Sequence, residues 1–173
     1  MSGVLVRRVR EGDGPAVAEL LTELGYPSDG ESVEARLGKL RASPNDYVLV
    51  AEKESEVVGV IKLHVMMVLH EDHDFGRLTA LVVREPSRGQ GIGHRFVAAA
   101  EEIARGRGCR RIEVTSAEHR TDAHDFYRHL GYAETSRRFI KHIPEVGGDV
   151  TEGRKLAGRT TTFCRSDIRS EER

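Results

Sequence analysis

The chain has 173 residues, and its 27 Lys and Arg nearly balance its 28 Asp and Glu. The length suits one globular domain with its own hydrophobic core, and the balanced charge excludes a global attraction to nucleic acid or to an anionic membrane. No apolar run approaches the roughly 20 residues that span a bilayer and no signal-peptide layout is present, so we expect a cytoplasmic protein. Cys109 and Cys164 lack CxxC spacing, which excludes a disulfide framework and a zinc knuckle.

The N-terminal part of the chain predicts one strand and two helices. A β-branched strand near residues 4–9 is followed by an amphipathic helix, with Asp13 as its N-cap and Pro15 in its first turn. A second helix, capped by Ser32, closes before Pro44, because the residue ahead of a proline resists helical geometry. Both helices are expected to cover a sheet.

Two β-branched runs, residues 47–51 and 57–61, flank a polar turn and predict an antiparallel hairpin. The second strand continues to Met67. A polar turn at residues 70–74 then leads to a returning strand over residues 78–83. Four strands are therefore expected before the middle of the chain.

A glycine-rich turn at residues 88–93 opens a helix with one apolar side, which ends at Gly106. A strand follows at residues 111–115. Asp122 caps the next helix, and Gly131 closes it. The order of elements is therefore mixed α/β.

The last part of the chain predicts a final strand pair at residues 132–133 and 138–141. From Val146 onward, glycines and charges occur without an apolar period. We therefore expect a domain over residues 1–145 and a polar, flexible tail over residues 146–173.

The glycine-rich turn gathers backbone N–H groups at the start of a helix, and the helix dipole adds to their attraction for a phosphate. A P-loop requires Lys and then Ser or Thr after the last glycine, but His94 and Arg95 stand there. A dinucleotide fold requires a sixth-position glycine where His94 stands, and Glu113 lies inside a strand instead of near a ribose. The remaining alternative is a tight turn without a ligand.

The neighbours of this turn resemble the acetyl-coenzyme A signature of the GCN5-related N-acetyltransferase (GNAT) family. That signature is Arg or Gln, two residues of any type, Gly, any residue, then Gly or Ala, and Arg88, Gly91 and Gly93 occupy its positions. Residues 123–132 look like the second motif of the family, a helix that ends in a Gly-aromatic pair. The order of elements resembles the family over residues 4–143.

The resemblance implies an α/β (α+β) GNAT fold, with a mixed, mostly antiparallel central sheet of six to seven strands and about four helices. It implies transfer of the acetyl group of acetyl-CoA to a primary amine of a small molecule, by direct attack in a ternary complex. Within the family, the chain looks most like aminoalkylphosphonate and aminoglycoside N-acetyltransferases. The alternatives are a protein or peptide acetyltransferase and a non-catalytic acyl-CoA sensor, and self-association as a homodimer stays open.

The resemblance also implies that backbone groups hold the cofactor. One strand edge is expected to pair with the pantetheine arm like an added strand, and an amide near Val83 is expected to face the thioester oxygen. Amides of the glycine-rich turn are expected to hold the diphosphate. The expected cofactor-binding residues are Leu81, Val82, Val83, Arg88, Gly89, Gln90, Gly91, Ile92, Gly93 and His94.

Tyr127 is the candidate general acid, because a phenol with a pKa near 10 stays protonated at neutral pH and can donate to the departing thiolate. The family often has a tyrosine at this motif position. The alternative is a core aromatic that packs under the sheet beside Phe126.

The general base is less determined, because many relatives carry a carboxylate where this chain has Leu78, Thr79 and Ala80. Water-mediated deprotonation is one alternative. The other candidate bases are Glu113, His64, His119 and His124.

The sequence contains one cluster with the composition of a metal site, at residues 70–74. Clustered acids and histidines at a hairpin tip are more often a solvated turn, so we expect no metal. The same acids suit a cationic acceptor, whereas Arg120, Arg137 and Arg138 suit an anionic one, so charge leaves the acceptor open.

Overall fold

The computed structural model describes residues 3–135 and 138–143. The chain divides into two units, Met1–Ala133 and Glu134–Arg173, and all of the described helices and strands belong to the first unit. The elements are β1 (Leu5–Arg8), α1 (Gly14–Glu23), α2 (Gly30–Ala42), β2 (Asp46–Lys53), β3 (Glu56–Met66), β4 (Phe75–Val83), a 3₁₀ helix (Glu85–Ser87), α3 (Ile92–Gly106), β5 (Ile112–Val114) and α4 (Thr121–His129). The predicted tail, residues 146–173, lies outside the described residues.

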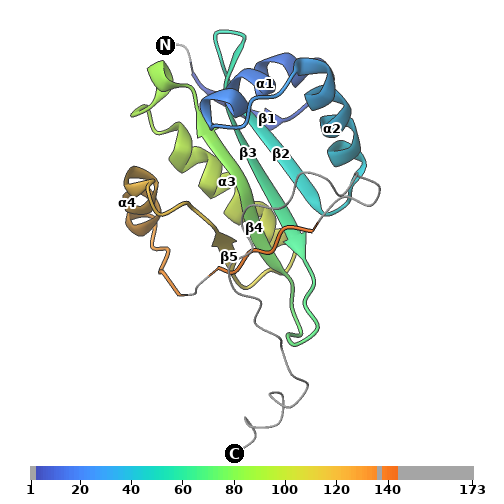
Figure 1. Ribbon diagram of the computed structural model, residues 1–173, viewed down its shortest axis with the longest axis vertical. Coiled ribbons are helices and arrows are strands. Elements are labelled where there is room, and N and C mark those ends of the chain that lie inside the picture. The colour runs from blue at the N-terminus through green and yellow to red at the C-terminus, as the bar shows by residue number, and fades with distance from the viewer. Residues whose placement is uncertain (1–2, 136–137, 144–173) are drawn as a thin grey trace, which may run out of the picture. The chain divides into compact units, whose positions relative to one another are not determined.

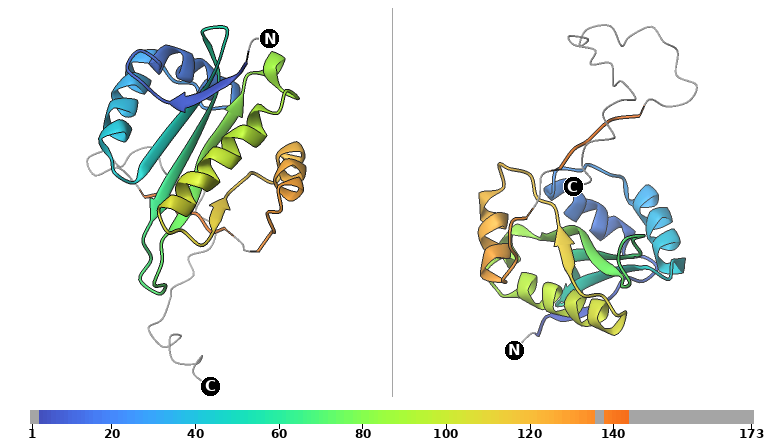
Figure 2. Two further views of the ribbon diagram at one scale, coloured as in Figure 1. Left: turned by 180° about the vertical axis from the view of Figure 1, so that it is seen from behind. Right: turned by 90° about the horizontal axis from the view of Figure 1, so that it is seen from below.

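The strands form one sheet in the order β1-β2-β3-β4-β5, in which only the β4–β5 pair is parallel. Helices α1 and α2 cover one face of this sheet and α3 covers the other (Figures 1 and 2). The mixed, mostly antiparallel α/β architecture that the sequence predicts is therefore confirmed. Among the described residues, no helix is long and apolar enough to cross a bilayer.

The central strands are buried on both faces, because helices lie on both sides of the sheet. Their near-continuous apolar runs feed two core clusters, one under α3 and one under α1 and α2. Phe96 of α3 is fully buried, and its ring lies over Gly59 of β3. A Cβ at Gly59 would stand 2.9 Å from Phe96 Cε2, so the glycine allows the helix to approach the sheet.

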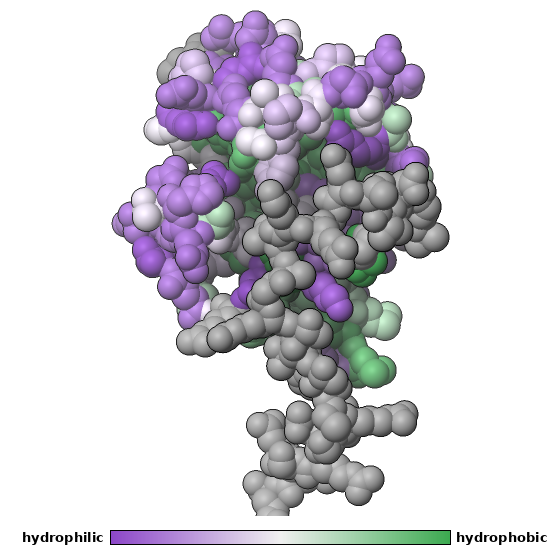
Figure 3. Space-filling model, viewed as in Figure 1, coloured by the Kyte–Doolittle hydropathy of each residue, from purple (hydrophilic) through white to green (hydrophobic). Residues whose placement is uncertain are grey.

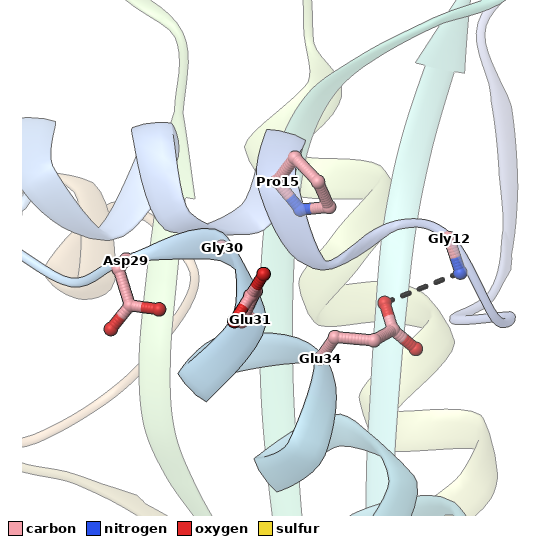
Figure 4. A pocket seen from close by; sticks show the side chains of 6 residues that line it. All are labelled: Gly12, Pro15, Asp29, Gly30, Glu31 and Glu34. Carbon is pink, nitrogen blue, oxygen red and sulfur yellow. Dashed lines mark hydrogen bonds between the residues drawn. The ribbon is translucent and has the colours of Figure 1, made fainter.

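The N-terminus of α1 is stabilised differently from the sequence prediction. Asp13 occupies the N-cap position, but its side chain makes no capping hydrogen bond. It accepts hydrogen bonds from Arg7 Nη1 at 2.8 Å and Nη2 at 3.0 Å. The carboxylate of Glu34, on α2, instead accepts from Gly12 N at 3.2 Å (Figure 4) and from Gly14 N at 2.8 Å. A paired guanidinium is the stronger partner for Asp13, and Glu34 satisfies the exposed amides.

Two further capping predictions are wrong. Helix α2 begins at Gly30, two residues before Ser32, because Asp29 is the N-cap and accepts a hydrogen bond from Ser32 N at 2.9 Å. Asp122 lies inside the first turn of α4, whose N-cap position is Arg120. In both α2 and α4 the sequence identified the start of the helix to within a few residues but chose the wrong capping residue.

The predicted final strand pair is also wrong, and the sheet has five strands over the described residues instead of six to seven. Tyr132 N donates to Tyr127 O at 3.0 Å, which closes the end of α4, and Gly131 adopts φ +86° to make this turn. The backbone of Tyr132 is thus used by the helix and cannot begin a strand. Without a strand at residues 132–133, the run at 138–141 lacks a hairpin partner and is irregular.

We expect Phe96→Ala to lower the free energy of unfolding by about 3–5 kcal/mol, because it removes a fully buried ring that fixes α3 on the sheet. Urea denaturation followed by far-UV circular dichroism measures this change. The control is Leu5→Ala, at a side chain that is 56% exposed, for which a change within about 0.5 kcal/mol is expected. Equal effects of the two substitutions would contradict the packing of Phe96 between α3 and the sheet.

Candidate active site

Strand β4 has an open edge along its second half. It pairs with β3 over its whole length, but with β5 only at Gly76, Arg77 and Leu78. After these three residues the chain beyond β5 leads away toward α4 (Figure 1). Residues 79–83 therefore expose one side of their backbone, with no strand opposite it in the part of the chain that the structure describes.

The hydrogen bonds around β4 identify which backbone groups face this open edge. Arg84 N donates to Val58 O of β3 at 2.8 Å, and successive residues of a strand point their backbone groups to opposite sides. The N–H and C=O groups of Val83 and Leu81 therefore point away from β3. Consistent with this, Val83 O accepts a hydrogen bond from Arg88 Nε at 2.9 Å instead of from a strand.

A bulge interrupts β4 next to the open edge. Lys62 of β3 pairs with Ala80, whereas Leu63 pairs with Leu78, so Thr79 is one extra residue in the ladder. Bulges free backbone groups and redirect side chains, and they are frequent beside active sites. Here the bulge lies at the position where the parallel pairing of β4 with β5 ends.

The glycine-rich turn provides a cradle of backbone amides. Gly89 and Gly91 adopt φ +75° and +76°, a left-handed conformation that disfavours other residues. Gly91 is the N-cap of α3, which has no side-chain cap and no acidic residue in its first turn. The first N–H used inside the helix is that of Arg95, which donates to Gly91 O at 3.1 Å. The amides that precede Arg95 in α3 therefore face out of the helix end, an arrangement that suits an anion.

The third glycine of the turn has a different role. A Cβ at Gly93 would stand 3.1 Å from Phe126 Cζ on α4. The ring of Phe126 also packs edge-on against His94, with centroids 5.4 Å apart. Gly93 thus allows α4 to dock against the start of α3, and this contact fixes the helix that carries Tyr127.

Other side chains tie the turn to the sheet. Lys53 Nζ, at the end of β2, donates to Gln90 Oε1 at 3.1 Å, and Gln90 Nε2 donates to Pro86 O at 3.2 Å. Ile92, the first residue of α3, is buried, as are Val82 on the α1–α2 side of β4 and Val83 on the α3 side. Of the ten residues expected to bind the cofactor, these three have buried side chains, so any contact they make with a ligand must come from the backbone.

Tyr127 is half-buried at the margin of the core cluster under α3, which also includes Leu81 and Val114. Its ring packs edge-on against Phe126 and Tyr132, with centroids 5.2 and 5.5 Å away. Burial raises the pKa of the Tyr127 phenol, an effect that the positive charge of Arg120 partly offsets. The phenol is therefore protonated at neutral pH.

The predicted base candidates lie in different places. Glu113 of β5 is the register partner of Arg77, but its Oε1 accepts a hydrogen bond from Arg111 Nε at 2.8 Å. His119 is exposed in the segment between β5 and α4, and His124 is partly buried in the first half of α4. Glu113 is thus the only one of these three on the sheet, and its carboxylate is ion-paired.

The sequence identified only two members, His64 and Glu113, of a group of polar residues on the sheet. We call it the polar strand cluster: Asp46, Lys62, His64, Arg77 and Glu113. Register and alternation place all five on the α1–α2 face of the sheet, beyond the apolar contact of those helices. The available sequence signal was Lys62 and His64, two polar residues spaced by two within an otherwise apolar strand.

A pocket of about 520 Å³ lies elsewhere, at the N-termini of α1 and α2. Figure 4 shows Asp29, Glu31 and Glu34 around it, and such acidic walls repel a diphosphate. The surface over α1, α2 and α4 is mostly hydrophilic (Figure 3). In the β3–β4 loop, Glu71 pairs with Arg111 and also lies 3.2 Å from His73 Nε2, so its carboxylate already has partners.

Comparisons with known proteins agree with this geometry. The model of the acetyltransferase (GNAT) family matches residues 15–132. The chain is 39% identical, over 73% of its length and 80% of the relative's, to an aminoalkylphosphonate N-acetyltransferase of Salmonella typhimurium. It is 26% identical to an aminoglycoside N(6′)-acetyltransferase of Stenotrophomonas maltophilia, over 83% of this chain and 95% of that one.

A solved aminoglycoside N-acetyltransferase in complex with coenzyme A has the same fold, with a TM-score of 0.74 and 16% identity over 83% of this chain and 96% of that one. The family model covers well over half of the chain, and its range includes the open edge of β4, the glycine-rich turn and α4. The chain therefore belongs to the GNAT family, and it is an acetyl-CoA-dependent N-acetyltransferase.

Proposed function

We propose that the open edge of β4 and the glycine-rich turn hold acetyl-CoA, and that the enzyme acetylates the primary amine of a small molecule. The observation that carries this proposal is the continuity of the two features. The unpaired backbone of residues 79–83 leads through a short 3₁₀ helix directly to the free amides at the start of α3. A ligand with an amide-containing arm and a diphosphate at its end fits such a surface.

The residues present fit the cofactor at both ends. Leu81 and the N–H of Val83 offer backbone groups to a pantetheine arm. Arg88 N donates to Glu85 O at 3.1 Å, so the amides from Gly89 to His94 are the donors offered to a diphosphate. Gly89 and Gly91 supply the left-handed backbone that gathers these donors. The side chain of Arg88 is 54% exposed and adds positive charge, which Glu23 at 3.9 Å partly offsets. When bound, acetyl-CoA supplies an acetyl thioester that is reactive toward amines.

Tyr127 fits the role of general acid. Its raised pKa keeps the phenol proton available at neutral pH, and its core cluster includes Leu81 at the open edge. The hydroxyl would protonate the sulfur as the thiolate departs.

The acceptor that we propose is a small primary amine that also carries an anionic group. The relative at 39% identity is an aminoalkylphosphonate N-acetyltransferase. Arg77 supports the same acceptor here, because its Nη2 donates only to Thr115 Oγ1, at 3.1 Å, and it has no ion pair among the described residues. A guanidinium in this state can bind a phosphonate through paired hydrogen bonds.

For the cofactor cradle, Gly91→Ala is expected to weaken binding of coenzyme A about tenfold, or by about 1.4 kcal/mol, measured by isothermal titration calorimetry. Gly12→Ala is a matched control, because Gly12 has φ +91° and, like Gly91, open space where a Cβ would stand. Both substitutions should cost about 1–2 kcal/mol of stability. Equal loss of affinity in the two variants would contradict the proposed cradle.

For the general acid, Tyr127→Phe is expected to lower kcat by about 10²- to 10⁴-fold while the affinity for coenzyme A stays unchanged. The matched control is Tyr132→Phe, which removes the neighbouring hydroxyl, a buried group without a hydrogen-bond partner among the described residues. Steady-state kinetics with thiol detection, together with calorimetry, separate the two effects. A full kcat in the Tyr127 variant would contradict this role.

For the acceptor, a panel of amines should show turnover with aminoalkylphosphonates above that with aminoglycosides, thialysine or lysine peptides. Arg77→Gln is expected to lower kcat/KM for the phosphonate about 10- to 100-fold, mainly through KM, and to leave an uncharged amine less affected. Arg36→Gln, on the exposed side of α2, serves as the control. Preferred turnover of peptides, or coenzyme A binding without any turnover, would support the alternative functions instead.

A further inference from the structure

His64 and Asp46 form a hydrogen-bonded pair inside the polar strand cluster. The two residues are register partners on β3 and β2, and His64 Nδ1 lies 2.9 Å from Asp46 Oδ1. The side chain of Asp46 is only 11% exposed, whereas that of His64 is 34% exposed. The carboxylate is therefore fixed inside the protein, while part of the imidazole reaches the surface.

Asp46 is ionised in this setting. Burial disfavours its charged form, but hydrogen bonds from Lys62 Nζ at 2.7 Å, Ser43 Oγ at 2.6 Å and His64 outweigh burial and lower the pKa of Asp46 to about 2. An ionised carboxylate can only accept hydrogen bonds. His64 Nδ1 must therefore carry the proton that joins the two residues.

This hydrogen bond determines the chemistry of the second ring nitrogen. In a neutral imidazole with a protonated Nδ1, Nε2 carries a lone pair. Nε2 of His64 has no hydrogen-bond partner among the residues that the structure describes. The pair thus presents a partly exposed proton acceptor with a fixed orientation.

The position of His64 relates this acceptor to the active site. The register partner of His64 on β4 is Arg77, which lies two residues before the bulge at Thr79. Thr79 begins the open edge of β4, and the strand has no acidic side chain from Leu78 to Ala80. A base on the adjacent strand β3 would therefore lie beside the part of β4 where this chain has no carboxylate.

We infer that His64 is the general base of the acetyl transfer and that Asp46 is the residue that positions it. This inference rests on the proposed acceptor, a primary amine that binds beside Arg77. A primary ammonium group must lose a proton before its nitrogen can attack.

The proton balance of the step is complete with these groups. His64 Nε2 accepts a proton from the ammonium, either directly or through one water, and the freed lone pair of the amine forms the new N–C bond. The C–S bond breaks, and the electron pair that leaves with sulfur takes the proton of Tyr127. A second proton from the amine nitrogen is lost as the amide forms, and it returns Tyr127 to its protonated state, while His64 releases its proton to solvent.

The arrangement assigns the two proton transfers to opposite faces of the sheet. His64 lies on the α1–α2 face, because it is four residues from Val60 on the same strand, and Val60 belongs to the core cluster under those helices. Tyr127 packs against the cluster under α3. Glu113 shares the face of His64, but its Oε1 already accepts from Arg111 Nε, whereas Nε2 of His64 is unengaged by any described residue.

Charged side chains face His64 from its own strand and from the two strands beside it. Asp46 contributes from β2, Lys62 from β3 itself and Arg77 from β4. The segment after α2 contributes the neutral Ser43. The positive charge of Lys62 is paired with Asp46, so Arg77 is, over the described ranges, the unpaired cation nearest in register to the imidazole.

The first test uses the full chain and the best amine of the acceptor panel. His64→Gln is expected to lower kcat/KM about 10²- to 10⁴-fold near neutral pH, with coenzyme A affinity and melting temperature retained. The loss should shrink as pH rises, because the amine then loses its proton to solvent. His70→Gln, at a histidine that is 75% exposed, is the control and should behave as wild type.

The second test concerns Asp46 and does not depend on turnover. In ¹⁵N-histidine-labelled protein, long-range ¹H–¹⁵N correlation spectra should place neutral His64 in the Nδ1-protonated form. Asp46→Asn should change this tautomer, because an amide can donate to Nδ1, and should lower kcat/KM by up to about 10⁴-fold. Ser43→Ala, which keeps the carboxylate, should retain the tautomer.

The outcomes separate this inference from the proposed function. If wild-type protein acetylates no amine of the panel, the proposed acceptor fails. If wild type is active but His64→Gln keeps its kcat/KM and its pH profile, or if neutral His64 is protonated at Nε2, the assignment of His64 as the base is overturned. A lower melting temperature with unchanged kinetics would likewise show a structural role only.

Discussion

The proposed cofactor site depends on one limit in strand pairing: β5 pairs with β4 over only three residues. A strand in the middle of a sheet normally uses the backbone groups on both of its sides. Here the second half of β4 keeps one side unpaired, and an exposed edge of this kind readily accepts another extended chain. The bulge at Thr79 marks the same point on the other side of the strand. The sheet itself thus leaves room for a cofactor arm without requiring a deep pocket.

This limit also explains how groups from both faces of the sheet can meet. A continuous sheet would separate the α1–α2 face from the α3 face. Because the pairing of β4 with β5 ends at Leu78, no described strand separates the two faces beside residues 79–83. The polar strand cluster lies on one face and Tyr127 on the other, and the glycine-rich turn holds α3 and α4 at the end of the opening through Gly93 and Phe126.

The sequence predicted those features that depend on local pattern. The glycine-rich turn, the apolar face of α3 and the long second strand of the hairpin each carry their signal within a few neighbouring residues, and all three are present. The capping prediction for α1 was wrong because the partners lie outside the local cap sequence: Asp13 bonds to Arg7, and Glu34 bonds to amides 20 and 22 residues before it. The final strand pair was wrong because the β propensity of residues 132–133 could not reveal that the end of α4 already uses the N–H of Tyr132.

Only part of the candidate site could be found from the sequence, because the rest depends on contacts between residues far apart in the chain. A family motif identifies the turn and Tyr127, but strand register decides which side chains share a face, and register is not written in any single strand. His64 was a candidate, yet Asp46 lies 18 residues away and has no signature of its own. The pairing becomes visible only when β2 and β3 are aligned residue by residue.

The hydrogen bonds from Gly12 and Gly14 to Glu34 have a consequence for the dynamics of the fold. One carboxylate of α2 satisfies amides at the start of α1, so separating the two helices would leave those amides without their protein acceptor. Helices α1 and α2 should therefore detach from the sheet together, as a single cooperative unit, instead of fraying one after the other. Such a unit would expose the α1–α2 face of the sheet while the layer under α3 stays folded.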